Sequence, residues 1–333
     1  MSNSPNLAQL RIWEQEAFSA LSQNRGDQAR APIEQLAKFF PRHPSVLFLK
    51  RWAALTEFDW PAQREAISLV RRSVSPNAVD LVLFHVDLPS APSGLHEKTD
   101  YLAVAAMSFE AAERKAPNAR RILLTDEATS VPEGIHAHEV IRYPLNREWP
   151  MYERMRMQER YLSTRPAGRA TVFMDVDVVT GRDPLEIFAE DFDIGLTWRP
   201  EFPDAPINGG LILAGSGDAA RIFFQATLQC YDALAADPRL MPLWERDLRA
   251  WWGDQFALIL MIGYRDFIQR SAKGIGVNGL RIRLFPCADY NFTPEPGVNY
   301  TAQFLASRYF LHFKGNRKPM QNWYLELMRQ GQL

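Results

Sequence analysis

Cysteine is scarce in this sequence, and a long uncharged apolar stretch is absent from it. The only cysteines are Cys230 and Cys287, which lie far apart and without CxxC spacing. This usage argues against a disulfide framework and against a structural zinc site. No stretch approaches the roughly 18 apolar residues of a membrane span, and the N-terminal segment carries charges and no apolar signal region. We therefore expect a cytoplasmic protein without a membrane span, the inner face of a membrane being the alternative location.

The sequence also lacks an excess of charge of either sign. Its 38 Lys and Arg residues nearly cancel its 39 Asp and Glu residues, so no overall field attracts nucleic acid. An anionic ligand must therefore be held by a local site. The chain has 333 residues, of which 47% are hydrophobic, which is enough for a large core and favours two domains.

Residues 7–71 show apolar residues at helical spacing, interrupted by short breaks. Shifting this region by thirty-four positions superposes Phe18 on Trp52 and Ile33 on Ile67. That period is the one of tetratricopeptide repeats. We therefore predict a tetratricopeptide-like helical domain over residues 1–75, through which a protein partner could be recruited.

The stretch from Gly26 to Pro44 carries this resemblance in its residues. It is similar to the second helix and exit of a tetratricopeptide repeat, and the likeness covers about two repeats. Trp60 replaces the glycine expected in the second turn, so the second copy is divergent. A simple helical hairpin is the alternative.

After Pro76 the pattern changes to short apolar runs that alternate with helical segments, which indicates an α/β domain with a mostly parallel sheet over residues 76–333. The expected strands are Ala78–Val86, Arg121–Thr125, a strand near Val140 and Ala170–Val179, and the expected helices are Tyr101–Ala116 and Met151–Leu162. Such sheets bind ligands at the carboxyl ends of their strands.

Asp175 and Asp177 end the apolar run Thr171–Met174 of the last of these strands. Residues two apart on a strand face the same side, so both carboxylates can bind one divalent cation. A chain of this length contains about one such pair by chance, and a second pair, Asp191 and Asp193, follows an apparent helix end. We interpret the second pair as solvated loop residues.

Four sequence blocks together resemble retaining glycosyltransferases with the GT-A fold, of the glycogenin and lipopolysaccharide galactosyltransferase kind. The likeness extends over about residues 80–320 and implies a Rossmann-like α/β domain. The blocks are FMDVDVV (173–179), PINGGLILA (206–214), WGDQFAL (252–258) and HFKGNRKPM (312–320).

This resemblance implies a metal site and a diphosphate site. His312 matches the histidine that joins the two aspartates on Mn²⁺, with Mg²⁺ as the alternative ion, and two carboxylates with one imidazole suit Mn²⁺ better than Ca²⁺. Gly315 lets the backbone approach phosphate oxygens, and Lys318 brings a cation to them. Met320 departs from the family pattern, which usually has an aromatic residue after the proline.

The resemblance also implies contacts with the donor sugar. Asn208 and Gly209 match residues that lie against this sugar, although the NGG sequence by itself is a turn signal. Asp254 and Gln255 match a pair near the reacting carbon and are the predicted catalytic residues, although Asp254 at the start of a helix could simply be an N-cap. Arg154 matches a basic residue that contacts the donor.

Asp87 and Thr125 are predicted to contact the donor from their positions alone, because each follows one of the first two strands of the domain. His136 and His138 lie two residues apart, and we interpret them as a solvated strand end without a third ligand.

The resemblance thus implies a hexosyltransferase that moves a sugar from a nucleotide diphosphate, of which uridine diphosphate is the expected one, with retention. The acceptor is a hydroxyl of a glycan, a lipid-linked molecule or a protein. Two alternatives are a haloacid-dehalogenase-like phosphatase that uses the DVDVV loop, and a non-catalytic tetratricopeptide interaction protein.

Overall fold

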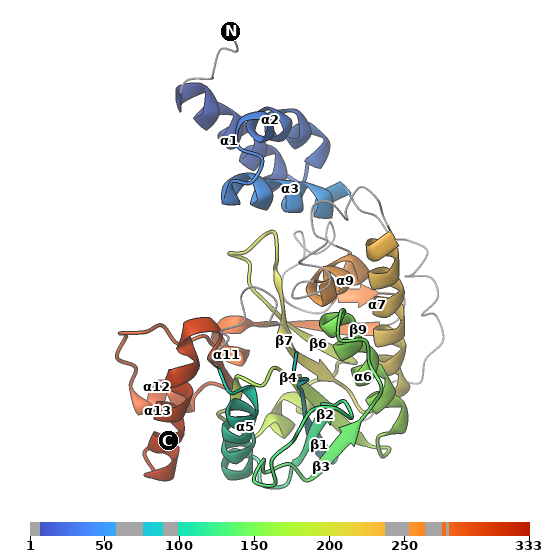
Figure 1. Cartoon of the computed structure of the whole chain (residues 1–333), viewed down its shortest axis with the longest axis vertical. Coiled ribbons are helices and arrows are strands. Elements are labelled where there is room, and N and C mark those ends of the chain that lie inside the picture. The colour runs from blue at the N-terminus through green and yellow to red at the C-terminus, as the bar shows by residue number, and fades with distance from the viewer. Residues whose placement is uncertain (1–6, 58–75, 89–98, 237–252, 264–274, 278–279) are drawn as a thin grey trace.

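The computed structural model describes residues 7–57, 76–88, 99–236, 253–263, 275–277 and 280–333. Within them, a helical segment precedes an α/β unit (Figure 1). The helices are α1 Leu7–Ser22, α2 Gly26–Phe39, α3 Pro44–Glu57, α5 Tyr101–Lys115, α6 Pro150–Thr164, α7 Asp218–Ala236, α9 Gly253–Ile262, α11 Cys287–Tyr290, α12 Ala302–Ala306 and α13 Lys318–Arg329, with 3₁₀ turns η1 Pro184–Ala189 and η2 Gly315–Arg317.

The strands form one large sheet and one small one. They are β1 Ala78–Phe84, β2 Arg120–Thr125, β3 Glu139–Arg142, β4 Arg169–Met174, β5 Val178–Thr180, β6 Ile194–Trp198, β7 Ile207–Ala214, β8 Ile275–Val277, β9 Leu280–Pro286 and β10 Phe310–His312. The eight-stranded sheet has the order β3-β2-β1-β4-β7-β6-β9-β8, and β5 pairs separately with β10.

The first four strands of the large sheet are parallel, whereas β7 runs antiparallel to both of its neighbours, β4 and β6. The beginning of β7 therefore lies at the edge of the sheet where β4 and β6 end. This mixed sheet confirms the α/β class, and it fits the GT-A architecture that the resemblance implies. The helices and strands predicted between Ala78 and Thr180 are present with ends shifted by a few residues, except that the single strand predicted over Ala170–Val179 is divided into β4 and β5.

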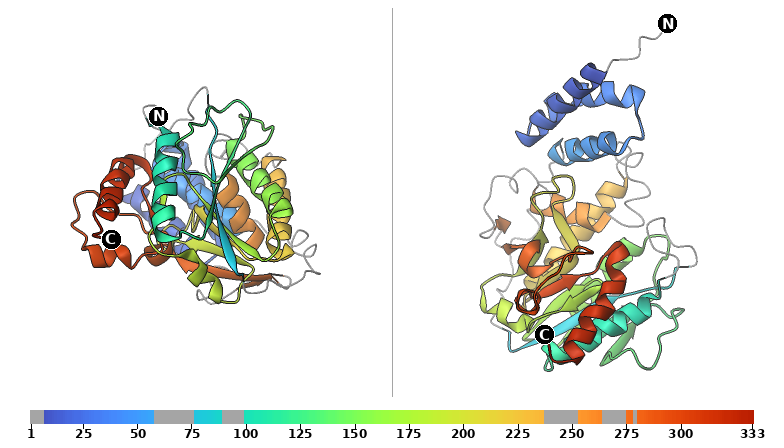
Figure 2. Two further views of the ribbon diagram at one scale, coloured as in Figure 1. Left: turned by 90° about the horizontal axis from the view of Figure 1, so that it is seen from below. Right: turned by 90° about the vertical axis from the view of Figure 1, so that its left-hand side faces the viewer.

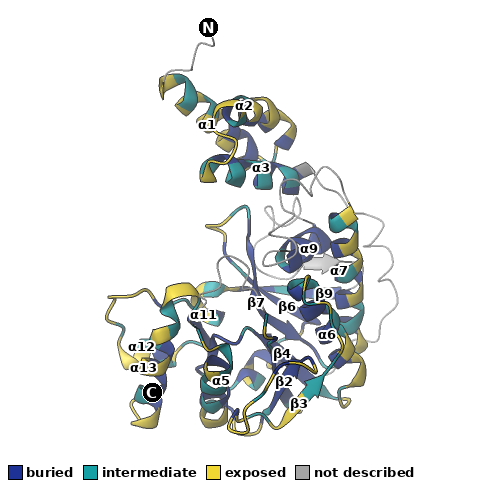
Figure 3. Cartoon of the chain, viewed as in Figure 1, coloured by how far each residue is buried: buried dark blue, intermediate teal, exposed yellow. Residues whose placement is uncertain are grey.

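Alternation along the strands divides the core between the two faces of the sheet. Val82 of β1 packs in the cluster that contains α6, α7 and α9, whereas its neighbours Leu81 and Leu83 pack in the cluster that contains α5. Residues two apart on a strand share a face, so the sheet is covered on both sides. Figure 2 shows α13 lying beside α5, and Figure 3 shows the strands buried between the helices.

The N-terminal helices pack through small and aromatic residues. The rings of Phe18 and Trp52, which the thirty-four-residue shift superposes, meet edge to face with centroids 5.3 Å apart. Ile67 lies outside the described residues, so the tetratricopeptide assignment and the domain boundary near residue 76 stay predictions. Arg51 of α3 pairs with Asp204 of the α/β unit at 3.7 Å. None of the helices in the described ranges has the length and apolarity that a bilayer crossing requires.

Candidate metal centre

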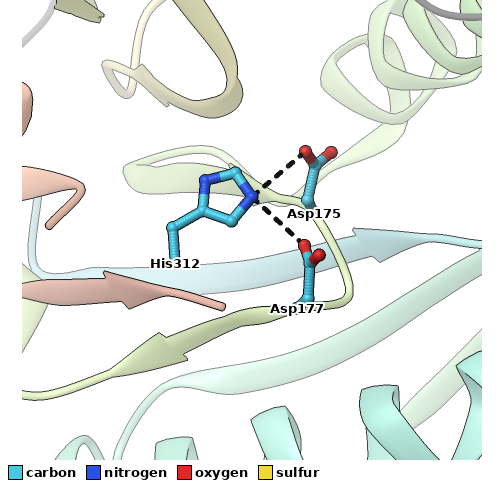
Figure 4. A group of neighbouring side chains, drawn as sticks. All are labelled: Asp175, Asp177 and His312. Carbon is cyan, nitrogen blue, oxygen red and sulfur yellow. Dashed lines mark ion pairs between the residues drawn. The ribbon is translucent and has the colours of Figure 1, made fainter. Parts of the chain in front are cut away.

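Asp175, Asp177 and His312 converge where β4 ends (Figure 4). The imidazole Nε2 of His312 lies 3.2 Å from Asp177 Oδ1 and 3.8 Å from Asp175 Oδ2. One ligand atom from each residue lies within 4.8 Å of the other two. In the part of the chain that the structure describes, no other three His, Cys, Asp or Glu side chains are grouped in this way. The structure therefore brings together the two aspartates and the distant histidine, as the sequence predicts.

Backbone pairing explains how a histidine so far along the chain reaches the aspartates. After β4 the chain turns through Asp175 to Asp177 and enters β5, whose Val178 stands opposite His312 in β10. The amide of Phe313 donates to the carbonyl of Asp177 at 2.8 Å. The β5–β10 pair therefore fixes the histidine beside the second aspartate.

The chemistry of this donor set fits a divalent cation. Two carboxylates and an imidazole nitrogen are ligands that Mn²⁺ accepts, and the other imidazole nitrogen, Nδ1, is already bonded to Asn291 Oδ1 at 3.1 Å. A metal-binding histidine usually has its second nitrogen held in this way. Asp177 and His312 are buried, whereas the side chain of Asp175 is 33% exposed and opens the group toward solvent.

Lys318 supplies a positive charge at the edge of the metal centre. Its Nζ lies 3.0 Å from Asp177 Oδ2, and it also stands 5.4 Å from the centre of the Tyr101 ring. Burial alone would raise the pKa of Asp177, but His312, whenever its imidazole is protonated, and Lys318 outweigh it and hold this pKa below its ordinary value. Asp177 is therefore a carboxylate at neutral pH.

Arg154 connects the metal centre to Asp254. Its guanidinium pairs with Asp175 and with Asp254, and it donates to the carbonyl of Gly209 at 3.1 Å. Burial lowers the pKa of Arg154, yet the two carboxylates raise it overall, so the guanidinium keeps its charge. Burial raises the pKa of Asp254, and Arg154 opposes that effect. Arg156, the next arginine of the same helix, is partly exposed and pairs with Glu153.

Two glycines of β7 pass directly under these side chains. A Cβ on Gly210 would lie 2.6 Å from Asp175 Oδ2 and 2.6 Å from His312 Cε1. A Cβ on Gly209 would lie 2.8 Å from Asp254 Oδ2 and 3.0 Å from Gln255 Cγ. Only glycine leaves the strand close enough for the two groups of polar side chains to sit over it.

The other predicted residues occupy different surroundings. Gly315 is exposed, and its φ of +63° is a left-handed backbone conformation that glycine adopts without strain. This conformation favours glycine here in addition to the predicted approach of the backbone to phosphate. Asp87 is exposed and contacts His85 and Thr129, neither of which belongs to the metal centre. Thr125 is fully buried at the end of β2.

Two interpretations of the sequence were wrong. Asp193 is not solvated: it is 1% exposed and binds the guanidinium of Arg281, whereas Asp191 is exposed as predicted. The turn that the NGG sequence by itself suggests is not formed either, because Asn208, Gly209 and Gly210 lie inside β7. In both cases a partner far away in sequence, Arg281 or the side chains above β7, decides the local structure.

Sequence reasoning missed two polar residues behind the metal centre. Asn291 contacts His312, and its Nδ2 donates to Thr197 Oγ1 at 3.1 Å. Asn291 follows the short helix α11, and Thr197 lies in β6. Neither position carries a motif or a periodicity that could have indicated it.

Solved structures offer a comparison of shape. The chain is similar to a galactosyltransferase, LgtC, solved with donor and acceptor sugar analogues, at 12% identity and a TM-score of 0.41, covering 76% of this chain and 100% of that one. It is also similar to a glycosyltransferase involved in glycosylation of the major capsid of PBCV-1, at 11% identity and a TM-score of 0.41, covering 75% and 99%. Mouse xyloside xylosyltransferase 1 matches at 15% identity and a TM-score of 0.43, covering 73% and 99%. No family model and no curated protein sequence matches the chain.

Proposed function

We propose that the protein is a metal-dependent glycosyltransferase that moves a hexose from a nucleotide diphosphate, uridine diphosphate in particular, to an acceptor hydroxyl. The observation that carries the proposal is the convergence of Asp175, Asp177 and His312 on one point at the carboxyl-end edge of the sheet. This edge is where α/β sheets bind their ligands. The four sequence blocks that resemble retaining GT-A enzymes supply the reaction type.

Asp175, Asp177 and His312 would hold Mn²⁺, or Mg²⁺ in its place. When bound, such an ion neutralises negative charge on a departing diphosphate. Lys318, 3.0 Å from Asp177, would leave this carboxylate to the ion and donate to the phosphate oxygens. The exposed left-handed turn at Gly315 would let the backbone amides there reach the same oxygens.

Asp254, Gln255, Asn208 and Gly209 would surround the donor sugar. Gly209 lies against both Asp254 and Gln255, so these residues form one surface beside the metal centre. Arg154 ties this surface to Asp175 and would keep the sugar in register with the diphosphate. Asp87 would contact the nucleoside, from the end of β1.

The burial of Asp254 bears on the stereochemistry. This carboxylate is 1% exposed and paired with Arg154, so it is poorly placed to act as a covalent nucleophile. Retention, which the resemblance implies, is then better served by an acceptor hydroxyl that attacks from the side of the leaving group. In that mechanism a phosphate oxygen of the donor takes the proton of the acceptor, and Asp254 holds Arg154 and the sugar in place.

The proposal also includes an acceptor and a protein partner, each at a different place on the protein. A glycan, lipid-linked or protein acceptor would approach the open side of Asp175. A protein partner could bind the N-terminal helices, where Phe18 of α1 and Phe40, directly after α2, are exposed although large and apolar. Removing residues 1–75 should then spare hydrolysis of the donor but weaken transfer, and equal loss of both activities would make the segment structural.

The central test is calorimetric titration of uridine diphosphate with and without Mn²⁺. Wild-type protein should bind the nucleotide tightly only with Mn²⁺, and Asp177→Asn or His312→Ala should abolish the metal-dependent part. The matched control is Asp191→Asn, because Asp191 belongs to the second aspartate pair and is exposed. Undiminished metal-dependent binding in the Asp177 variant would rule out the site.

The same preparation distinguishes the alternatives. A phosphatase should release inorganic phosphate from phosphate esters, and an interaction protein should bind neither metal nor nucleotide. A panel of nucleotide sugars with Mn²⁺ in a thermal-shift assay would then identify the donor, because a ligand that binds only the native state raises the melting temperature.

A further inference from the structure

A chain of buried hydrogen bonds runs from β7 to the metal centre. Thr197 Oγ1 lies 3.1 Å from the carbonyl oxygen of Asn208 and 3.4 Å from that of Leu211. Asn291 Nδ2 lies 3.1 Å from Thr197 Oγ1, and Asn291 Oδ1 lies 3.1 Å from His312 Nδ1. The three residues that supply these side chains, Thr197, Asn291 and His312, are at most 3% exposed, so water does not compete for their hydrogen bonds.

The direction of every bond in this chain is set at its β7 end. The register between β6 and β7 shifts at Leu196 and Thr197, and the Thr197 hydroxyl bonds to carbonyl groups beside that irregularity. A carbonyl oxygen can only accept, so the Thr197 hydroxyl must donate its single hydrogen there. Its lone pairs then remain to accept, and they face the Asn291 amide.

Asn291 must therefore present its NH₂ group to Thr197 and its oxygen to His312. The Asn291 oxygen can only accept, so the hydrogen between Asn291 and His312 belongs to Nδ1 of the imidazole. A neutral imidazole with its hydrogen on Nδ1 has a lone pair on Nε2. That nitrogen is the one that faces Asp175 and Asp177.

Cys287 also contacts the Thr197 hydroxyl, and it does not change the direction of these hydrogen bonds. Burial raises the pKa of the Cys287 thiol to about 11, so the thiol keeps its hydrogen at neutral pH. A thiol can donate to the Thr197 oxygen, whereas a thiolate would have drawn the hydroxyl hydrogen away from β7.

We propose that Thr197 and Asn291 are positioning residues that hold His312 with its hydrogen on Nδ1, so that the Nε2 lone pair points at the cation position before any ion arrives. The inference rests on the proposed function for the identity of the site. It assigns two residues, neither of which touches the ion, a role in metal affinity. The opposite orientation of the Asn291 amide would put the hydrogen on Nε2, where it would bond to Asp177 and block the ion.

Nuclear magnetic resonance of the metal-free protein tests the direction of these hydrogen bonds. With ¹⁵N-labelled histidine at alkaline pH, the His312 ring should show a protonated Nδ1 and an unprotonated Nε2, the signals being assigned by their loss in His312→Gln. Asn291→Leu and Thr197→Val should abolish this preference. A protonated Nε2 in the wild-type protein would overturn the proposal.

Mn²⁺ titration followed by electron paramagnetic resonance tests the consequence. Asn291→Leu, which keeps the size of the side chain, should weaken Mn²⁺ binding roughly 10- to 100-fold, as is typical when the partner of a ligating histidine is lost. Thr197→Val should weaken it less, because the Asn291 oxygen can still face His312 in part of the population. Unchanged affinity in Asn291→Leu would contradict the proposal.

Tyr161→Phe is the matched control for destabilisation. It also removes one buried hydrogen bond, from the Tyr161 hydroxyl to Asp80 at 2.6 Å, at a place with no contact to His312. This variant should lose stability and keep the Mn²⁺ affinity of the wild type. If wild-type protein binds no Mn²⁺, the proposed metal-dependent function is wrong. The ring signals of the metal-free protein would still decide whether Asn291 and Thr197 orient His312.

Discussion

Replacing Gly210 by alanine would add one methyl group beneath the metal centre. That carbon would stand 2.6 Å from both Asp175 Oδ2 and His312 Cε1, and 2.9 Å from Asn208 Oδ1. Gly210 lies inside β7 and is absent from the described glycines with positive φ, so alanine can adopt the same backbone. The only obstacle to the substitution is therefore the space that the site residues occupy.

The size of the effect follows from which neighbour can move. His312 is fixed on both sides by β5 and by Asn291, whereas the side chain of Asp175 is 33% exposed and can rotate away. Metal binding would force Asp175 back against the methyl group. Overpacking of this kind costs about 1–3 kcal/mol, and each 1.4 kcal/mol is tenfold in affinity, so Mn²⁺ should bind roughly 5- to 150-fold more weakly.

The assay is Mn²⁺ titration combined with thermal unfolding of the metal-free protein. Gly210→Ala should bind Mn²⁺ more weakly while its melting temperature changes little. Gly134→Ala is the matched control, because a Cβ on Gly134 would meet no atom within 4 Å. Equal Mn²⁺ affinity in Gly210→Ala and Gly134→Ala would refute the argument that β7 sets the space available to the metal ligands.

Two further predictions concern stability. Arg154→Met would leave Asp254 buried without its cation, which should cost about 3–5 kcal/mol; urea unfolding should show this loss, and adding Asp254→Leu should restore part of the stability without restoring activity. Gly26→Ala would place a Cβ 2.0 Å from Thr56 Oγ1 and strain the contact between α2 and α3. Thermal unfolding followed by circular dichroism should therefore show a lower melting temperature of the helical segment, and Mn²⁺ affinity should stay unchanged. An unchanged melting curve would contradict this packing.

The strands and the metal ligands could be predicted because each leaves a local signal. Buried parallel strands are continuous apolar runs, and polar residues that follow such a run mark the edge where ligands bind. Asp175 and Asp177 satisfied both conditions. His312 could be added because it closes another apolar strand and belongs to a block that resembles a known family, although nothing local says which strand it pairs with.

The errors and omissions arise where a long-range contact overrides the local pattern. Asp193 looks like a loop residue until Arg281 pairs with it, and the two glycines of β7 look like a turn until the space above the strand is known. Asn291 was missed for the same reason. Its two hydrogen bonds go to residues in other strands, and a single polar side chain in a short connection has no periodic signature.

The ion pairs of the site also explain why nucleotide binding should depend on the metal. Among the described residues, the permanent cations paired with Asp175, Asp177 and Asp254 are Arg154 and Lys318, so with a neutral His312 this group of side chains is net negative without an ion. Such a group repels a diphosphate. A divalent ion held by Asp175, Asp177 and His312 would reverse the sign and release Lys318 from Asp177. Binding of uridine diphosphate that is equally tight with and without Mn²⁺ would therefore contradict the balance of charges in this site.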